Sequence, residues 1–242
     1  MTTPARFVAL LLLFSISLYG ADRKIIHYEI SYLRIPLLDM TLTWIEDDST
    51  VRVTYDNQLK PFIAFIHPTH NIYRVHFRKR DFAPLEWSKS ISEGDFKFQL
   101  HARRTETGKR VRYLEGQEYD FPDGGFTVFS ATHFLASKAD EPGFFPAKIP
   151  VFVDGEVWQA RVTRYDAVHP HRDHQLEGDQ VLIQTELSKV GGSPVLEKND
   201  VLTSEIATEG TQFLLWVSPD GTYSKAQFGK FPRAVVLRRV KN

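Results

Sequence analysis

The stretch IYRVHFR, residues 72–78, contains the pattern that decides the fold. Its side chains alternate strictly, with Tyr73, Val75 and Phe77 on one side and Arg74, His76 and Arg78 on the other. Successive side chains of a β-strand point to opposite faces, so this alternation predicts a strand with one buried face and one face in water. Strands of this kind are typical of antiparallel sheets.

The same two-residue period recurs on both sides of this stretch. The apolar faces are formed by Ile26, Tyr28, Ile30 and Tyr32, by Met40, Leu42 and Trp44, by Val51, Val53 and Tyr55, and by Phe96, Phe98 and Leu100. Further along, Asp154-Gly155 and Asp220-Gly221 separate strand-like runs, and both dipeptides tolerate the positive φ angles of tight hairpin turns. We therefore predict an all-β fold of about ten or more antiparallel strands, which curl into a barrel, a half-barrel or a sandwich.

Residues 124–142, GGFTVFSATHFLASKADEP, break the alternation. Phe126, Phe129 and Phe134 recur at helical spacing, which predicts one short helix from about Thr127 to Ser137. A curved sheet with nothing on its concave face would expose a wide apolar strip, which soluble proteins avoid. We therefore expect this helix to cover the concave face, with Phe134 buried and a candidate to contact a ligand. If the cavity takes an apolar ligand, the helix can act as its gate. The proline-rich residues 141–150 are expected to form a crossing loop.

The composition supports a single folded domain with a sizeable core. The chain has 242 residues, of which 42% are hydrophobic and none is cysteine. Its stability must therefore come from core burial and strand pairing rather than from disulfides. Lysine and arginine together number 30, as do aspartate and glutamate, so no overall charge attracts nucleic acid. We expect no nucleic-acid partner.

Residues 1–20 have the order of features found in a secretory signal. Arg6 precedes an apolar run that begins at Phe7, and Gly20 and Ala21 supply small residues before a polar segment. The run is shorter than the roughly 20 apolar residues that a transmembrane helix needs. We expect cleavage to leave residues 21–242 as a single antiparallel β domain, periplasmic or otherwise exported, with no stable membrane span.

Three stretches together resemble a family of exported bacterial proteins, the domain of unknown function 3108 (DUF3108). They are HYEISYLRIPLLDMTLTW at 27–44, NIYRVHFRKRDFAPLEWSKSISEGDFKFQLHARR at 71–104, and FTVFSATHFLASKADEPG at 126–143. The closing LLWVSPDGTYSKAQF resembles the family more loosely, because the family usually has a proline and an aliphatic residue after this turn, whereas Tyr223-Ser224-Lys225 follows here. The resemblance implies an envelope protein with a curved antiparallel sheet, and more remotely a periplasmic lipoprotein carrier whose half-barrel holds acyl chains. It implies no catalytic residues.

Basic residues form a second pattern on the polar faces of the predicted strands. They are Arg74, His76 and Arg78 on one strand, Lys97, His101 and Arg103 on another, and Arg112 on a third. If these strands are neighbours, their polar faces combine into a cationic patch, and an anionic envelope component or an acidic protein can bind there. The other interpretation is an ordinary solvated sheet face with glutamates among the basic residues.

The stretch HPHRDH contains the candidate metal ligands His169, His171 and His174. A zinc site needs three or four ligands that converge on one point. The spacing matches no H-E-x-x-H motif, and the flanking residues are typical of a loop. We therefore expect a solvated loop between two strands and no cofactor, although a metal site remains the alternative.

No catalytic signature stands out in the chain. A G-x-S-x-G motif and a glycine-rich phosphate loop are absent, and there is no cysteine nucleophile. We therefore expect a non-catalytic exported envelope protein that binds a lipid-like ligand or an envelope partner. Two alternatives stay open. One is a protein-interaction module that uses the basic sheet face, and the other is a metal-assisted hydrolase that acts on a cell-envelope substrate.

Overall fold

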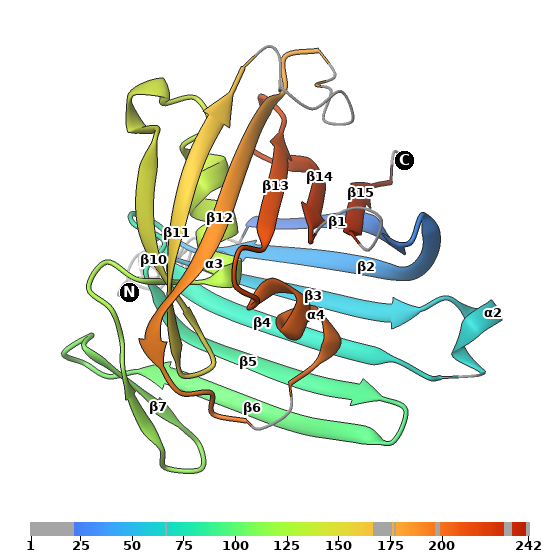
Figure 1. Ribbon diagram of the computed structural model, residues 1–242, viewed down its shortest axis with the longest axis horizontal. Helices are drawn as coiled ribbons and strands as arrows, with labels where there is room; N and C mark the ends of the chain where they lie inside the picture. Colours follow the sequence, from blue (N-terminus) through green and yellow to red (C-terminus); the bar gives the residue numbers. More distant parts are fainter. Residues whose placement is uncertain are drawn as a thin grey trace, which may run out of the picture.

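The computed structural model describes residues 22–65, 67–166, 176, 178–196, 199–229 and 234–240. It contains one open, curved sheet of 15 strands in the order β8-β7-β6-β5-β4-β3-β2-β1-β15-β14-β13-β12-β11-β10-β9. The sheet wraps around the helix α3, which lies on its concave side (Figure 1). The prediction of a mainly β protein with a curved antiparallel sheet and a short helix on its concave face is confirmed.

The strands fall into two arms that meet where β1 pairs with β15. The first arm comprises β1 (Asp22–Tyr32), β2 (Ile35–Glu46), β3 (Thr50–Leu59), β4 (His70–Arg78), β5 (Pro84–Glu93), β6 (Phe96–Arg104), β7 (Arg110–Tyr113) and β8 (Glu118–Asp120). The second arm comprises β9 (Phe126–Thr127), β10 (Ala147–Val153), β11 (Glu156–Tyr165), β12 (Val181–Gly192), β13 (Gln212–Val217), β14 (Tyr223–Phe228) and β15 (Val235–Arg239). The helices are α2 (Pro61–Ala64), α3 (Val128–Ser137), the 3-10 turn η1 (Pro142–Phe144) and α4 (Val201–Ile206).

The alternation in the sequence sorts side chains between the two faces of the sheet. In β4, Tyr73, Val75 and Phe77 are at most 1% exposed and face the interior, whereas Arg74 between them is exposed. The inward side chains in the middle of β1, β2 and β3 are buried in the same way. Burial of one side of each strand is therefore the main source of the core.

The helix α3 begins and ends close to the predicted positions. Thr127 caps its first turn, because its side chain accepts a hydrogen bond from the backbone of Ser130 while the Ser130 hydroxyl accepts one from the Thr127 backbone. Phe129 packs on the sheet, with its ring 4.6 Å from that of Tyr55 and 5.2 Å from that of Tyr73. The helix is thus a central part of the core.

The expected complete burial of Phe134 is wrong. The centre of its ring lies 4.6 Å from that of Phe126 in β9 and 5.5 Å from that of Phe144 in η1, and the side chain remains half-buried. We expect Phe134→Ala to lower the free energy of unfolding by about 2 kcal/mol, less than the 3–5 kcal/mol typical of a fully buried ring. Urea denaturation measures this change.

The matched control for that measurement is Phe62→Ala. Phe62 lies in α2 and is 59% exposed, so its removal should change the free energy of unfolding by less than about 0.5 kcal/mol. If Phe134→Ala has an effect as small as the control, the packing of Phe134 against Phe126 contributes nothing to stability.

Three local features differ from the expectations. Residues 141–150 do not form a crossing loop throughout, because the strand β10 begins at Ala147 and pairs with β11. The two-residue strand β9 pairs with β10 in parallel, since the chain crosses through α3 between them. The structure also has the short helices α2 and α4.

The predicted tight turn at Asp154-Gly155 is confirmed. Asp154 has a φ of 43° and Gly155 a φ of 95°, and Val153 pairs directly with Glu156. A Cβ atom on Gly155 would lie 2.3 Å from the carbonyl oxygen of Ser193, so only glycine fits there. This turn reaches the inner face of the first arm, where the ring centre of Phe152 lies 5.9 Å from that of Trp87 in β5.

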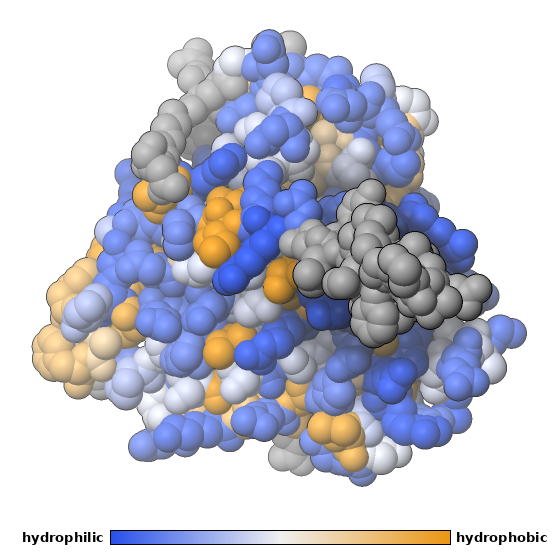
Figure 2. Space-filling view, turned by 180° about the vertical axis from the view of Figure 1, so that it is seen from behind, coloured by the Kyte–Doolittle hydropathy of each residue, from blue (hydrophilic) through white to orange (hydrophobic). Residues whose placement is uncertain are grey.

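The surface seen from behind is mainly hydrophilic, and hydrophobic residues gather at the edge where α2 projects (Figure 2). Phe65, which follows α2, is 80% exposed. In the part of the chain that the structure describes, no helix is both long and apolar enough to cross a membrane.

Candidate functional site

A large cavity opens at one end of the sheet, between α3 and the inner faces of β1 and β2. We call it the end cavity. It encloses about 950 Å³, including its open mouth. The strand ends and the β13–β14 turn form its rim, and α3 contributes His133 and Ser137. The apolar and aromatic wall consists of Ile26, Tyr28, Leu42, Trp44, Phe82 and Tyr223.

The alternation of side chains along β1 and β2 decides which residues form this wall. Ile26 pairs with Leu42 in the β1–β2 ladder, and both point inward because they lie on the apolar face of their strands. Trp44 lies further out, opposite Lys24. The wall is therefore apolar in its depth and becomes polar towards the mouth.

The rim carries charges of both signs. Glu46 accepts a hydrogen bond from Trp44 Nε1 at 3.1 Å and forms an ion pair with Lys79. That hydrogen-bonded ammonium lowers the pKa of the Glu46 carboxyl. Asp220, on the opposite side of the mouth, lies 3.7 Å from Arg239. These pairs leave the rim strongly polar without a dominant sign of charge.

The floor of the end cavity is aromatic and uncharged. The hydroxyl of Tyr55 lies 2.7 Å from Nε2 of His133, and the hydroxyl of Tyr28 donates to the carbonyl oxygen of Tyr223 at 3.0 Å. Burial lowers the pKa of His133 to about 3, so its imidazole is neutral at physiological pH. Burial also raises the pKa of Tyr28, Tyr55 and Tyr223, so all three stay protonated.

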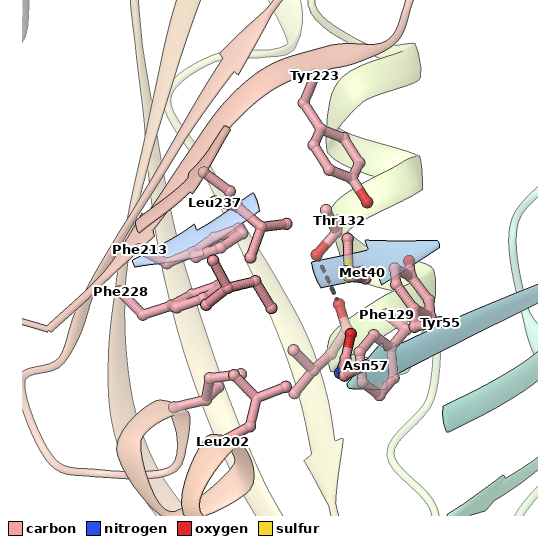
Figure 3. Close-up of a pocket in the computed structure, with 14 residues that line it drawn as sticks. Met40, Tyr55, Asn57, Phe129, Thr132, Leu202, Phe213, Tyr223, Phe228 and Leu237 are labelled. Carbon is pink, nitrogen blue, oxygen red and sulfur yellow. Dashed lines mark hydrogen bonds between the residues drawn. The ribbon is translucent and has the colours of Figure 1, made fainter. Parts of the chain in front are cut away.

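A smaller cavity continues on the far side of this floor, and we call it the inner cavity (Figure 3). It is much narrower than the end cavity, and its wall is almost entirely apolar. The side chains of Met40, Phe129, Leu202, Phe213 and Phe228 lie around it, contributed by β2, α3, α4, β13 and β14.

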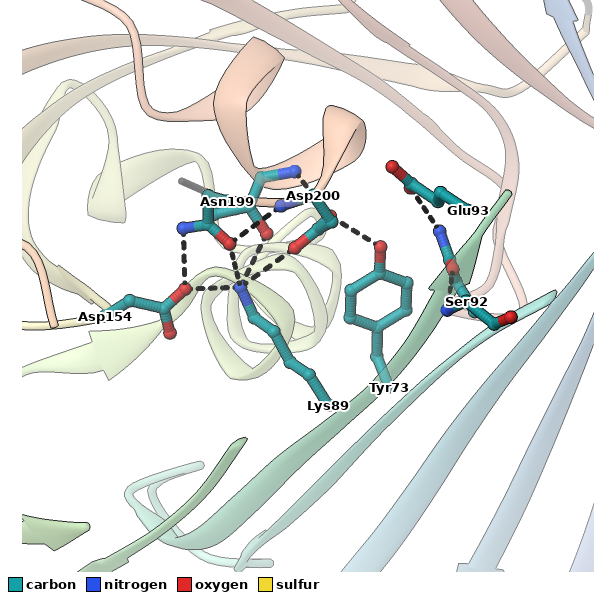
Figure 4. A network of polar contacts seen from close by, with 9 residues as sticks. Tyr73, Lys89, Ser92, Glu93, Asp154, Asn199 and Asp200 are labelled. Atoms are coloured by element: carbon teal, nitrogen blue, oxygen red, sulfur yellow. Dashed lines mark hydrogen bonds and ion pairs between the residues drawn. The ribbon is translucent and has the colours of Figure 1, made fainter. Parts of the chain in front are cut away.

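A buried polar network lies beside α4 (Figure 4). The ammonium of Lys89 donates to Thr203 Oγ1 at 2.6 Å, forms an ion pair with Asp154, and lies 3.4 Å from Asp200 Oδ2. The hydroxyl of Tyr73 donates to Asp200 Oδ1 at 2.7 Å. The side chains of the three charged residues are at most 6% exposed.

The network keeps its charges despite its burial. Burial lowers the pKa of Lys89, but the carboxylates of Asp154 and Asp200 outweigh this effect and hold the pKa above its ordinary value. Burial likewise raises the pKa of Asp200, but Lys89 and the hydrogen bonds to the carboxylate outweigh it and lower the pKa. The network ties β5 to the β10–β11 turn and to the first turn of α4.

Sequence reasoning missed this network, although one signal was present. Trp87, Lys89 and Ile91 alternate with serines in β5, so the lysine occupies an inward position of an otherwise apolar face. A lysine at such a position requires a buried partner. The identity of that partner depends on the tertiary structure.

The predicted basic residues lie on the outer face of the first arm, away from both cavities. β5 separates β4 from β6, while β6 and β7 are neighbours. Two acidic residues divide the face: Glu86 binds His101 at 2.6 Å, and Glu118 binds Arg112 at 2.6 Å. Arg74, Lys97 and Arg103 are exposed and form no ion pair within the described residues. Binding by this face stays a prediction.

The candidate metal ligands His169, His171 and His174 lie outside the described residues. Among the residues that are described, no three His, Asp or Glu side chains are arranged to hold a metal ion. Phe134 does not line either cavity, although its ring is 6.0 Å from that of Phe82, which lines the end cavity. Ligand contact by Phe134 and gating by α3 both stay predictions.

One solved structure that resembles this chain is a beta-barrel-like protein of Domain of Unknown Function DUF1849 from Brucella abortus. The similarity covers 90% of this chain and 95% of that chain, with a TM-score of 0.51 and 10% sequence identity. At this identity the likeness shows the fold alone. No protein-family model and no curated protein matches the sequence, so the resemblance to DUF3108 stays a prediction.

Proposed function

We propose that this chain is a non-catalytic protein of the cell envelope that binds a lipid-like ligand in its end cavity. The observation that carries the proposal is the combination of an apolar, aromatic wall with a charged rim in a cavity of about 950 Å³, its open mouth included. Binding sites for small molecules are typically concave and mostly apolar, with a few polar groups that orient the ligand. The apolar part of an amphiphile fits the wall, and its polar head fits the rim.

The chemistry of the floor supports binding rather than catalysis. An effective general acid or base has a pKa near the working pH. Burial lowers the pKa of His133 to about 3 and raises the pKa values of Tyr55 and Tyr223. None of these three groups therefore changes its protonation state near pH 7. Because the floor carries no charge, an apolar chain that contacts it does not have to desolvate an ion.

A direct test is to titrate the protein with a fluorescent long-chain fatty acid and to measure displacement by unlabelled fatty acid. The variant Ile26→Trp places an indole in the end cavity, because Ile26 lies in its wall and is 7% exposed. We expect this variant to bind the probe about tenfold more weakly than the wild-type chain, since the added ring removes apolar contact area from the ligand.

The matched control is Leu114→Trp, which adds the same side chain at a position that is 75% exposed. It should bind the probe like the wild-type chain, and circular dichroism should show that both variants are folded. Equal affinity of Ile26→Trp and the control would contradict the proposed site. If the wild-type chain binds no fatty acid but binds anionic vesicles in a salt-dependent way, the exposed basic face with Arg74 and Arg103 replaces the cavity as the binding site.

A further inference from the structure

The end cavity and the inner cavity lie one after the other along the same secondary-structure elements. In β1, Ile26 and Tyr28 line the end cavity and Ile30 lines the inner cavity. In β2, Leu42 lines the end cavity and Met40 the inner one. Because each change of cavity takes only a two-residue step along a strand, the two cavities lie next to each other along the inner faces of β1 and β2.

An aromatic layer separates the two cavities. Among the described residues, Tyr223 is the one residue that lines both. Its ring stacks on Tyr28 with ring centres 5.3 Å apart, and its ring centre lies 6.0 Å from that of His133. Tyr55 in turn is bound to His133 of α3, so the layer spans the space from β1 across to the helix.

The position of Tyr223 makes its ring the central part of this layer. Its side chain is 4% exposed and extends from β14 towards α3 above the inner cavity (Figure 3). Below the ring, Ala226 and Phe228 continue the same strand along the wall of the inner cavity. Removal of the ring would therefore take away the one described side chain that borders both cavities.

We propose that the two cavities are segments of one channel for a single unbranched apolar chain, and that the ring of Tyr223 closes the channel and sets the length of the chain that fits. This inference rests on the proposed function of the end cavity. The ligand class is a straight-chain amphiphile, because the two cavities lie one after the other along two strands and a helix. The polar head stays at the charged rim, and the end of the chain stops at Tyr223.

The test compares saturated fatty acids from octanoate to stearate by displacement of the fluorescent probe. In the wild-type chain, affinity should rise with each methylene and then stop rising once the chain reaches Tyr223. In Tyr223→Ala, affinity should continue to rise beyond that length by about fourfold for each added methylene, the factor that corresponds to burial of one methylene group.

The matched control is Tyr223→Phe, which keeps the ring and removes the hydroxyl. It should show the same limiting length as the wild-type chain. If Tyr223→Ala does not fold, Tyr223→Leu shortens the side chain with less loss of packing and should also extend the limit. These readouts depend on the length of the ligand, so a general loss of stability does not mimic them.

The outcomes separate this inference from the proposed function. If the wild-type chain binds no fatty acid of any length, the proposed function itself fails. If it binds them with the same limiting length in Tyr223→Ala, Tyr223→Leu and wild type, the cavity binds ligand but Tyr223 does not set its length. A wild-type affinity that rises steadily up to stearate would also overturn the inference.

Discussion

Replacement of Lys89 by methionine should lower the free energy of unfolding by about 3–5 kcal/mol, the range observed when one partner of a buried ion pair is removed. Methionine preserves most of the volume of the lysine side chain, so the loss comes from the charge. It leaves the carboxylates of Asp154 and Asp200 in the interior without their cation. Urea denaturation at neutral pH measures the change.

A control and a rescue make this prediction specific. Lys138 pairs with Glu141 on the surface at 2.8 Å, and Lys138→Met should cost less than about 1 kcal/mol because exposed ion pairs contribute little. The triple change Lys89→Met, Asp154→Asn and Asp200→Asn should recover part of the loss, since it removes the unpaired charges as well. A loss below about 1 kcal/mol for Lys89→Met alone would show that the network is not needed for stability.

Acidification should destabilise the protein through His133, by about 2 kcal/mol between pH 6.5 and pH 4.5. Burial lowers the pKa of this imidazole from 6.5 to about 3 in the folded chain. Below pH 6.5 the unfolded chain therefore binds a proton that the folded chain does not bind, so stability falls as the pH decreases towards 3. The slope approaches about 1.4 kcal/mol per pH unit for one such group.

The variant His133→Gln isolates this contribution. Glutamine can accept the hydrogen bond from Tyr55 but does not titrate, so the variant should lose about 2 kcal/mol less than the wild-type chain over the same pH interval. The exposed His27 provides the control, and His27→Gln should keep the full pH dependence. Equal losses in the wild-type chain and His133→Gln would mean that His133 is protonated in the folded state.

The strands could be predicted from the sequence because their pattern is local. The alternation of Tyr73, Val75 and Phe77 with basic residues assigns each side chain to a face without any knowledge of the neighbouring strand. The turn at Asp154-Gly155 is equally local, since it depends on the φ angles that these two residues tolerate. The helix α3 could be predicted from the helical spacing of its aromatic residues, because its 10 residues are enough for that spacing to show.

Shorter elements were not predictable in this way. The helix α4 has 6 residues and β9 has 2, which is too few for a hydrophobic period to show. Their conformations depend on contacts made elsewhere, such as the cap that Asp200 provides to α4 and the pairing of Phe126 with Val151. Tertiary contacts of this kind override weak local preferences.

The candidate site was only partly predictable. The sequence predicted that Arg74, His101 and Arg103 lie on the polar faces of their strands, and the structure places them there. The cavity residues Tyr28 and Trp44, in contrast, could not be told from ordinary core residues in the sequence. A buried face in the sequence does not reveal whether the space opposite it is filled. That depends on how tightly the sheet curves and on which side chains meet across it.

The sequence by itself determined the fold class, the hairpin turns, the central helix and the sides of the strands on which the basic residues lie. Only the tertiary structure decided that Lys89 meets Asp200, which is 111 positions away, and that Tyr223 divides two cavities beside α3. The physical reason is the range of the interactions. Backbone periodicity and turn geometry act over a few residues, whereas charge pairing and cavity shape depend on side chains that approach one another only when the sheet has rolled up around its helix.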